Sequence, residues 1–176
     1  MLRQLVALGG VAVVVGCGAA DSAKSPRVEA CPSGTAELGV KDILPDPPAG
    51  TEIVAADRKT TKPVEDAFRK AGGDSFKSLR SRVVVKRGRA VGTLVIVLNA
   101  NERMNPRDVL LGARDSASES GAEPKELTVA GEDGVLVVSA DGAAAAGTVG
   151  DCSGVTLFGP TEAEVRAVAE KVQRPE

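Results

Sequence analysis

The segment that decides the fold is TLVIVL, residues 93–98. Five of its six residues are aliphatic and the sixth, Thr93, is β-branched, so a strand formed here carries apolar side chains on both faces. Such a strand is typical of the interior of a sheet that is covered on each side. We therefore expect 93–98 to be a central strand, with other elements packed on both of its faces.

The residues before this segment predict a β-hairpin and one further strand. Arg87 and Gly88 separate two arms rich in β-branched residues, 82–86 and 90–98, which is a hairpin signal. Closer to the N-terminus, a proline-rich lead is followed by a short apolar run at 51–56. That run predicts the first strand.

Three segments predict helices with an N-terminal cap. Thr61 is expected to cap the first, which ends at Gly72-Gly73, and Asn105-Pro106 begins the second. Thr161 begins the last and forms a capping box with Glu164. The apolar residues expected to face the core of these helices are Val64, Ala67, Phe68 and Ala71, then Val109, Leu110 and Ala113, then Val165, Val168, Ala169 and Val172.

Turn dipeptides divide residues 125–158 into short apolar runs. They are Asp133-Gly134, Asp141-Gly142 and Gly150-Asp151, and they predict an antiparallel meander of four strands. The alanine run 143–146 favours a helix by propensity, but the flanking turn signals favour a strand whose small side chains admit a close neighbour. The predicted fold is α+β, an antiparallel sheet of six or seven strands packed by about three helices.

The N-terminal residues predict a secretory signal. Arg3 provides the positive charge and 5–15 the apolar core, which is shorter than the about 20 apolar residues that span a bilayer. Residues 14–17, Val-Val-Gly-Cys, resemble the lipobox of bacterial lipoproteins. That resemblance implies a diacylglyceryl thioether on Cys17, cleavage just before it, and a lipid anchor on the extracytoplasmic face of the cell membrane. Ordinary secretion, with cleavage after residues 18–20 and loss of Cys17, is the alternative.

The organisation expected from this resemblance has three parts. Residues 1–16 are a lipoprotein signal peptide, 17–30 are the lipidated cysteine with a flexible tether, and 31–176 are a single α+β domain. The composition of the domain, rich in Ala, Gly, Val and Arg, is similar to that of small actinobacterial lipoproteins. At 5 to 6 Å times the square root of its 13 residues, the tether spans about 20 Å.

Cys31 and Cys152 are the two cysteines of the expected domain. An isolated pair in an oxidising compartment more often forms a disulfide than a reactive site, so we expect a bond that fastens the N-terminal lead to a late hairpin. Redox chemistry is the alternative, but the CxxC spacing typical of it is absent from the sequence.

The residue types exclude several kinds of active site. The chain has no His, Trp or Tyr, so His-dependent nucleophile systems and His-based metal sites are excluded. A pair of carboxylates could still hydrolyse glycosides, but the aromatic residues that usually stack on sugars are absent. We therefore predict that the protein is not an enzyme and that it uses no cofactor or metal.

Charge is unevenly distributed along the chain. Residues 58–89 contain 11 Lys and Arg against 3 Asp and Glu, whereas residues 115–176 contain 4 against 12. The predicted hairpin gathers basic residues that could dock anionic lipid headgroups or an acidic envelope protein: Arg82, Lys86, Arg87 and Arg89. The alternative is that these charges only keep strand edges soluble. Nucleic acid is not expected, because no aromatic residues are interleaved with the basic ones.

Two functions from different classes are left. The first is a lipid-anchored interaction module that recruits or regulates an envelope protein through its polarised surface; it predicts a filled core. The second is a carrier or sensor of an apolar envelope ligand such as a lipid. It is motivated by the small residues 143–146 and Gly92, and it predicts a cavity of roughly several hundred Å³. An envelope enzyme comes third.

Overall fold

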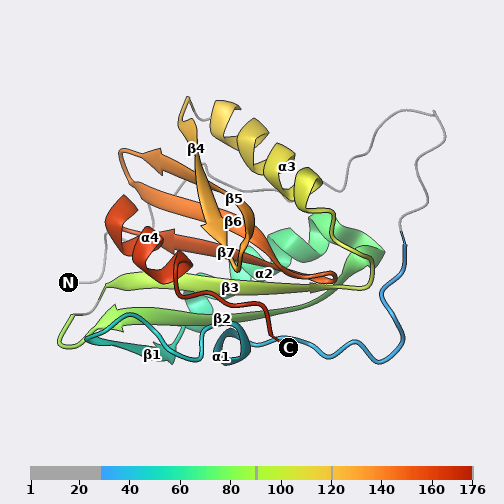
Figure 1. The fold of residues 1–176 in the computed structure, drawn as a ribbon, viewed down its shortest axis with the longest axis horizontal. Helices are drawn as coiled ribbons and strands as arrows, with labels where there is room; N and C mark the ends of the chain where they lie inside the picture. The colour runs from blue at the N-terminus through green and yellow to red at the C-terminus, as the bar shows by residue number, and fades with distance from the viewer. Residues whose placement is uncertain (1–28, 90, 120, 176) are drawn as a thin grey trace.

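The computed structural model describes residues 29–89, 91–119 and 121–175, and its strands form one antiparallel sheet (Figure 1). The sheet has seven strands in the order β1-β2-β3-β7-β6-β5-β4. In chain order they are β1 (Thr51–Ala55), β2 (Phe76–Lys86), β3 (Gly92–Ala100), β4 (Glu123–Val129), β5 (Glu132–Ser139), β6 (Gly142–Gly150) and β7 (Ser153–Gly159).

Four α-helices accompany the sheet in the part of the chain that the structure describes, and a 3-10 turn (Gly73–Ser75) follows the second of them. They are α1 (Val40–Ile43), α2 (Arg58–Gly72), α3 (Pro106–Glu119) and α4 (Glu162–Ala169). Three of the four have eight residues or more, so the predicted α+β class, strand number and helix number are confirmed.

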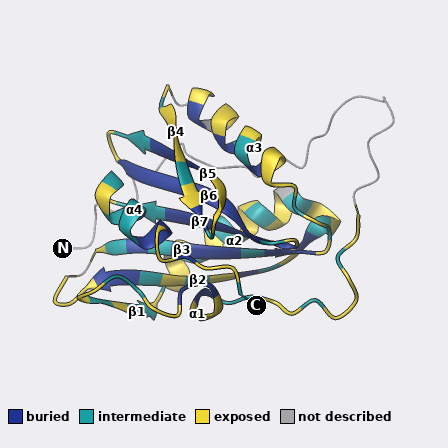
Figure 2. Cartoon of the chain, viewed as in Figure 1, coloured by how far each residue is buried: buried dark blue, intermediate teal, exposed yellow. Residues whose placement is uncertain are grey.

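The predicted central position of residues 93–98 is confirmed. Strand β3 pairs with β2 on one side and with β7 on the other. Val95 and Val97 are fully buried in the main core with α1 and α4, whereas Ile96 lies on the opposite face in a cluster with Phe68 of α2. Figure 2 shows this interior as a band of buried strands, with exposed surfaces on the outer sides of the helices.

Helix α3 packs against the far half of the sheet, over β5 and β6. Its start is the predicted one: Asn105 Oδ1 accepts a hydrogen bond from the backbone N–H of Arg107 at 3.0 Å. The residues that form this second core are Val109, Ala113 and Ala117 of the helix with Val135, Val137 and Ala146 of the strands. Both faces of the sheet are thereby covered.

The alanine run forms a strand, as the flanking turn signals predicted, and both of its faces are packed. Ala143 and Ala145 lie in the main core with α4, whereas Ala146 lies under α3. All four alanines are buried. Their short side chains therefore let a helix approach β6 from each side.

The turn predicted at Asp133-Gly134 is wrong, because both residues belong to β5. The chain reverses at Ala130-Gly131, where φ is 53° and 81°, as a two-residue turn with positive φ at both positions requires. Gly134 serves a different purpose: a Cβ there would lie 2.8 Å from Cγ2 of Val129. This glycine allows close packing within the sheet rather than a reversal of the chain.

The predicted start of α2 is also wrong. The helix begins at Arg58, and Asp57 is its cap, with its carboxylate accepting a hydrogen bond from the Lys59 N–H at 2.9 Å. Asp is at least as good a cap as Thr, so the earlier residue extends the helix by one turn. Pro63 then lies inside the helix. The single turn α1 carried no signal in the sequence.

Candidate functional site

Three of the four basic residues singled out from the sequence, Lys86, Arg87 and Arg89, lie at one end of the sheet, and Arg82 lies four residues earlier on β2, opposite Val95. Arg82 and Lys86 belong to β2, and Arg87 and Arg89 lie in the turn that joins β2 to β3; we call these four residues the basic hairpin. All four side chains are exposed. The backbone N–H of Arg89 donates to the carbonyl of Lys86 at 2.9 Å, which closes the turn.

Two of these cations have a counter-ion that sequence reasoning missed. Glu164 of α4 places its Oε1 3.7 Å from Lys86 Nζ and 3.8 Å from Arg89 Nη1. Thr161 caps α4 as predicted, with Oγ1 accepting from the Glu164 N–H, but the Glu164 carboxylate faces the hairpin. Its Oε2 is buried and makes no hydrogen bond within the described residues. The hairpin is therefore anchored on α4 through Glu164.

The other two cations of the basic hairpin are free for a partner. Arg82 makes one hydrogen bond, from Nη1 to the carbonyl of its neighbour Ser81 at 3.3 Å, and Arg87 has no side-chain partner in the described ranges. Coulomb attraction to an external anion is therefore not already offset at these two residues by an internal carboxylate.

A recess of about 220 Å³ lies beside Arg82, between α1 and β2. Its lining residues are Gly39, Val40, Lys41, Asp42, Arg80, Ser81 and Arg82. Arg80 is already paired with Glu37, from Nη2 to Oε2 at 2.8 Å, and Asp42 Oδ2 accepts from the Gly39 N–H at 2.7 Å. Apart from the Arg80–Glu37 pair, the recess holds the positive charges of Lys41 and Arg82 against the single negative charge of Asp42, so it keeps a net positive charge of one.

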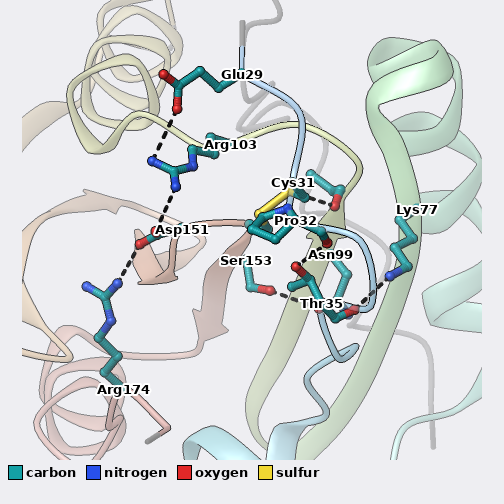
Figure 3. Close-up of a disulfide and its surroundings, with 12 residues drawn as sticks. Glu29, Cys31, Pro32, Thr35, Lys77, Asn99, Arg103, Asp151, Ser153 and Arg174 are labelled. Carbon is teal, nitrogen blue, oxygen red and sulfur yellow. Dashed lines mark hydrogen bonds and ion pairs between the residues drawn. A yellow bond between two sulfur atoms is a disulfide. The ribbon is translucent and has the colours of Figure 1, made fainter.

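The predicted disulfide joins Cys31 to Cys152, and it lies at the end of β3 away from the basic hairpin (Figure 3). Cys152 sits in the turn between β6 and β7, so the N-terminal lead is fastened to a late hairpin as expected. Glu29 and Ala30, which the sequence assigned to the tether, are already engaged here. The Arg103 N–H donates to the Glu29 carbonyl at 2.8 Å, and Ala30 forms a β-bridge with Glu102.

A chain of ion pairs runs beside the disulfide, as Figure 3 shows. Arg103 contacts Glu29 at 3.2 Å and Asp151 at 4.0 Å, and Asp151 in turn contacts Arg174 at 2.5 Å. These side chains are about half exposed, so each pair contributes at most about 1 kcal/mol to stability. Together they connect the N-terminal residues, the β6–β7 turn and the C-terminal residues, which is a structural role.

Asn99 is the polar residue in this region that sequence reasoning did not single out. It is 2% exposed, and its Oδ1 accepts from the Leu38 N–H and from Ser153 Oγ, both at 2.9 Å. Its Nδ2 donates to the Leu38 carbonyl at 3.0 Å and to Ser78 Oγ at 3.3 Å. A polar residue at the end of an apolar strand was the available signal. Its role in the structure is to hold the N-terminal segment on the sheet.

The carboxylate with a perturbed pKa belongs to an ion-pair cluster. Glu162 accepts from Lys125 Nζ at 2.7 Å and from Arg166 Nε at 2.9 Å, and these hydrogen bonds, Lys125 first, lower the pKa of Glu162 below its ordinary value. A carboxyl group held ionised in this way is a poor proton donor near neutral pH. The cluster links α4 to β4.

The described ranges show no metal centre and no membrane-spanning helix. They contain no group of three or more Cys, Asp or Glu side chains arranged to hold a metal ion. None of their helices is long and apolar enough to cross a membrane. Cys17, the predicted lipid attachment site, lies outside the described residues.

The turn of the basic hairpin and the disulfide lie at opposite ends of β3. Gly92 follows the hairpin turn, whereas the Ala100 N–H donates to the Cys152 carbonyl at 2.9 Å. At about 3.3 Å per residue, the nine residues of β3 separate these ends by about 26 Å. A chain that leads from the described domain toward the N-terminus therefore leaves from the end away from the basic hairpin.

Comparisons with protein-family models, with curated proteins and with solved structures each found no match.

Proposed function

We propose that this protein is an extracytoplasmic lipoprotein, anchored to the cell membrane through Cys17, whose domain is a non-enzymatic module that binds an envelope protein. The lipobox-like residues 14–17 support the anchor. The Cys31–Cys152 disulfide is consistent with it, because disulfides persist in oxidising compartments outside the cytoplasm.

The position of the basic hairpin is the observation that carries the interaction module. The N-terminal chain joins the domain at Glu29 and Ala30, which are held at the disulfide end. The turn of the basic hairpin lies about 26 Å further along β3, at the other end, whereas Arg82 lies between the two ends, opposite Val95. The hairpin turn, with Arg87, therefore lies at the end of the domain away from the point where the N-terminal chain joins it, and an acidic protein surface is the expected partner there.

The packing of β6 supports the interaction module over a lipid carrier. The small residues that motivated a carrier are buried against helices on both faces of the sheet. Gly92 is also needed for packing, since a Cβ there would lie 2.1 Å from the Val84 carbonyl oxygen. These residues therefore have a structural purpose that requires no ligand.

The anchor is tested by the Cys17→Ala variant, with Ser22→Ala as the matched control in the same segment. We expect Cys17→Ala to leave the precursor uncleaved or to release the protein from the membrane fraction, because no thiol is left to carry the lipid. Immunoblots of fractionated cells measure both effects. Normal cleavage and full membrane retention of Cys17→Ala would contradict the anchor.

The module is tested by photo-crosslinking in living cells. A photoreactive amino acid replaces Arg87 in one strain and Lys125, on β4 at the other edge of the sheet, in a control strain. We expect a discrete protein adduct from position 87 that is absent from position 125 and that decreases when Arg82→Glu is added. Adducts to lipid alone, or equal adducts from both positions, would contradict the proposed function.

A further inference from the structure

The two edges of the sheet differ in their protection against pairing with another strand. Edge strand β4 reads EPKELTV, and its first four residues are exposed: Glu123, Pro124, Lys125 and Glu126. Proline and charged residues on an edge discourage an added strand. Edge strand β1 reads TEIVA, with one charged residue and no proline. Of the two edges, β1 is therefore the one that can accept another strand.

The hydrogen bonds of β1 show which of its backbone groups face outward. The Arg87 N–H donates to the Gly50 carbonyl at 3.2 Å, and Thr51 lies opposite Lys86. By the alternation of antiparallel ladders, the backbone N–H and C=O groups of Thr51, Ile53 and Ala55 point away from β2. The Thr51 N–H bonds to the Pro48 carbonyl at 3.1 Å. No other described strand pairs with Ile53 or Ala55, so their outward groups are open.

A positively charged recess adjoins this open edge. Arg82 is the register partner of Ala55, and it also lines the 220 Å³ recess with Lys41. Ala55 is exposed and its side chain is short, so Arg82 is not screened from a strand lying beyond β1. An acidic side chain of such a strand, on the same face as Ala55, would meet Arg82 and Lys41.

We propose that the outer edge of β1 binds an extended acidic segment of the partner protein by strand addition. Backbone hydrogen bonds to Ile53 and Ala55 provide affinity, and a carboxylate directed at Arg82 and Lys41 provides specificity, as in other strand-addition complexes. This inference rests on the proposed function and names the partner's chemistry: an extended, acidic strand with β-branched residues between its charges.

The probe is a fluorescent heptapeptide of alternating Glu and Val with blocked ends, compared with one in which every Glu is replaced by Lys. Binding to the full chain, purified in detergent, is measured by fluorescence anisotropy at low salt. We expect the acidic peptide to bind at least about tenfold more tightly, because unpaired cations favour one sign of charge. Equal affinities of the two peptides would overturn the proposal.

Two pairs of variants separate the edge from the charge. Ala55→Pro removes one outward N–H, whereas the matched Ala55→Val keeps it; we expect about fivefold or greater weakening for Pro alone. Arg82→Gln should weaken binding of the acidic peptide by a similar factor, whereas Lys70→Gln, on α2, should leave it unchanged.

NMR hydrogen exchange of the unmodified chain provides a measurement that does not depend on any variant. Added peptide should slow exchange at Ile53 and Ala55, and unchanged exchange there would overturn the proposal.

Vesicles test the competing partner, an anionic membrane. The full chain is mixed with phosphatidylcholine vesicles that contain one quarter phosphatidylglycerol. Vesicle binding that falls with Arg82→Gln but is unaffected by Ala55→Pro, in a protein that does not bind the acidic peptide, would overturn strand addition. The crosslinking at position 87 would still decide whether an envelope protein is bound, so failure at β1 is distinguishable from failure of the proposed function.

Discussion

Asn99 shows how much of the fold depends on one buried polar side chain. Its amide group satisfies both backbone groups of Leu38 and so fixes the N-terminal segment across the end of β3. An apolar residue would fit the strand pattern equally well, but it would leave the Leu38 N–H and C=O without these partners. Buried backbone groups without partners are costly, which gives the asparagine a structural purpose.

We expect Asn99→Ala to lower the free energy of unfolding by about 2 to 4 kcal/mol, because it removes four hydrogen bonds and leaves buried groups unpaired. Urea denaturation measures the change. The control is Asn101→Ala, two residues along, whose exposed side chain makes one hydrogen bond, to the Asp74 carbonyl. Its effect should stay within about 1 kcal/mol. Equal effects of the two variants would show that the Asn99 side chain does not hold the N-terminal segment on the sheet.

Glu162 gives the domain a defined response to acid. Its pKa is lowered in the folded state by hydrogen bonds from Lys125 and Arg166, so its contribution to stability is fully present above the ordinary value of 4.5. The contribution is lost as the pH falls through the lowered pKa. The free energy of unfolding should fall as the pH drops below about 5, and we expect this fall to be smaller in Glu162→Gln. Urea denaturation at several pH values measures the difference. An unchanged pH dependence would contradict this assignment.

At the scale of the elements, the sequence predicts those whose signals are local and strong. The apolar run 93–98 determines the central strand, and the caps at Asn105 and Thr161 determine where α3 and α4 begin. Elements whose signals compete are predicted less well. Asp57 and Thr61 are both capable caps, and the helix begins after the earlier one.

Glycine explains the wrong turn, because the same residue type permits both a reversal and a close approach. Gly134 and Gly131 lie three residues apart, and a pattern cannot tell which of them provides positive φ. The candidate site shows the same limit. The basic residues of the hairpin were visible in the sequence, but Glu164, which forms ion pairs with two of them, comes from a helix more than 70 residues away. Such pairing depends on tertiary structure.

The close packing of β6 can be tested with two glycines of the same strand. A Cβ at Gly147 would lie 2.8 Å from Cβ of the buried Val129, whereas one at Gly150 would meet its nearest atom at 4.0 Å. We expect Gly147→Ala to destabilise the fold by about 1 to 3 kcal/mol through overpacking. Gly150→Ala should change stability by no more than about 0.5 kcal/mol. Thermal unfolding of both variants provides the comparison, and similar melting temperatures would argue against tight packing at this position.

At the scale of the whole molecule, the sheet order separates the charges along the width of the sheet. The basic segment, residues 58–89, includes α2 and β2 near the β1 edge, and the acidic residues of β4 and β5 lie at the other edge. The uneven distribution of charge along the sequence therefore gives the folded molecule an electric dipole across the sheet. Such a dipole orients an approaching acidic partner toward the β1 edge and raises the rate of association more than the final affinity.

The disulfide acts on this scale because it joins residues 121 apart in the sequence. We expect the double variant Cys31→Ser, Cys152→Ser to lose about 2 to 5 kcal/mol of stability, since a long loop is no longer closed in the unfolded chain. Urea denaturation of this variant, compared with Cys17→Ser, measures the loss. Equal denaturation midpoints for the two proteins would show that the ion pairs beside the disulfide and the Asn99 hydrogen bonds stabilise the domain sufficiently without the covalent bond.

The place of β7 has a consequence for the order in which the chain can fold as it is synthesised. Strand β3 pairs with β7, which is the last of the described strands to be synthesised. Until residues 153–159 arrive, one edge of β3 is unpaired and its apolar side chains lack part of their cover, a condition that promotes aggregation. The sheet is therefore completed only when the C-terminal residues are available, and until then the growing chain must avoid self-association.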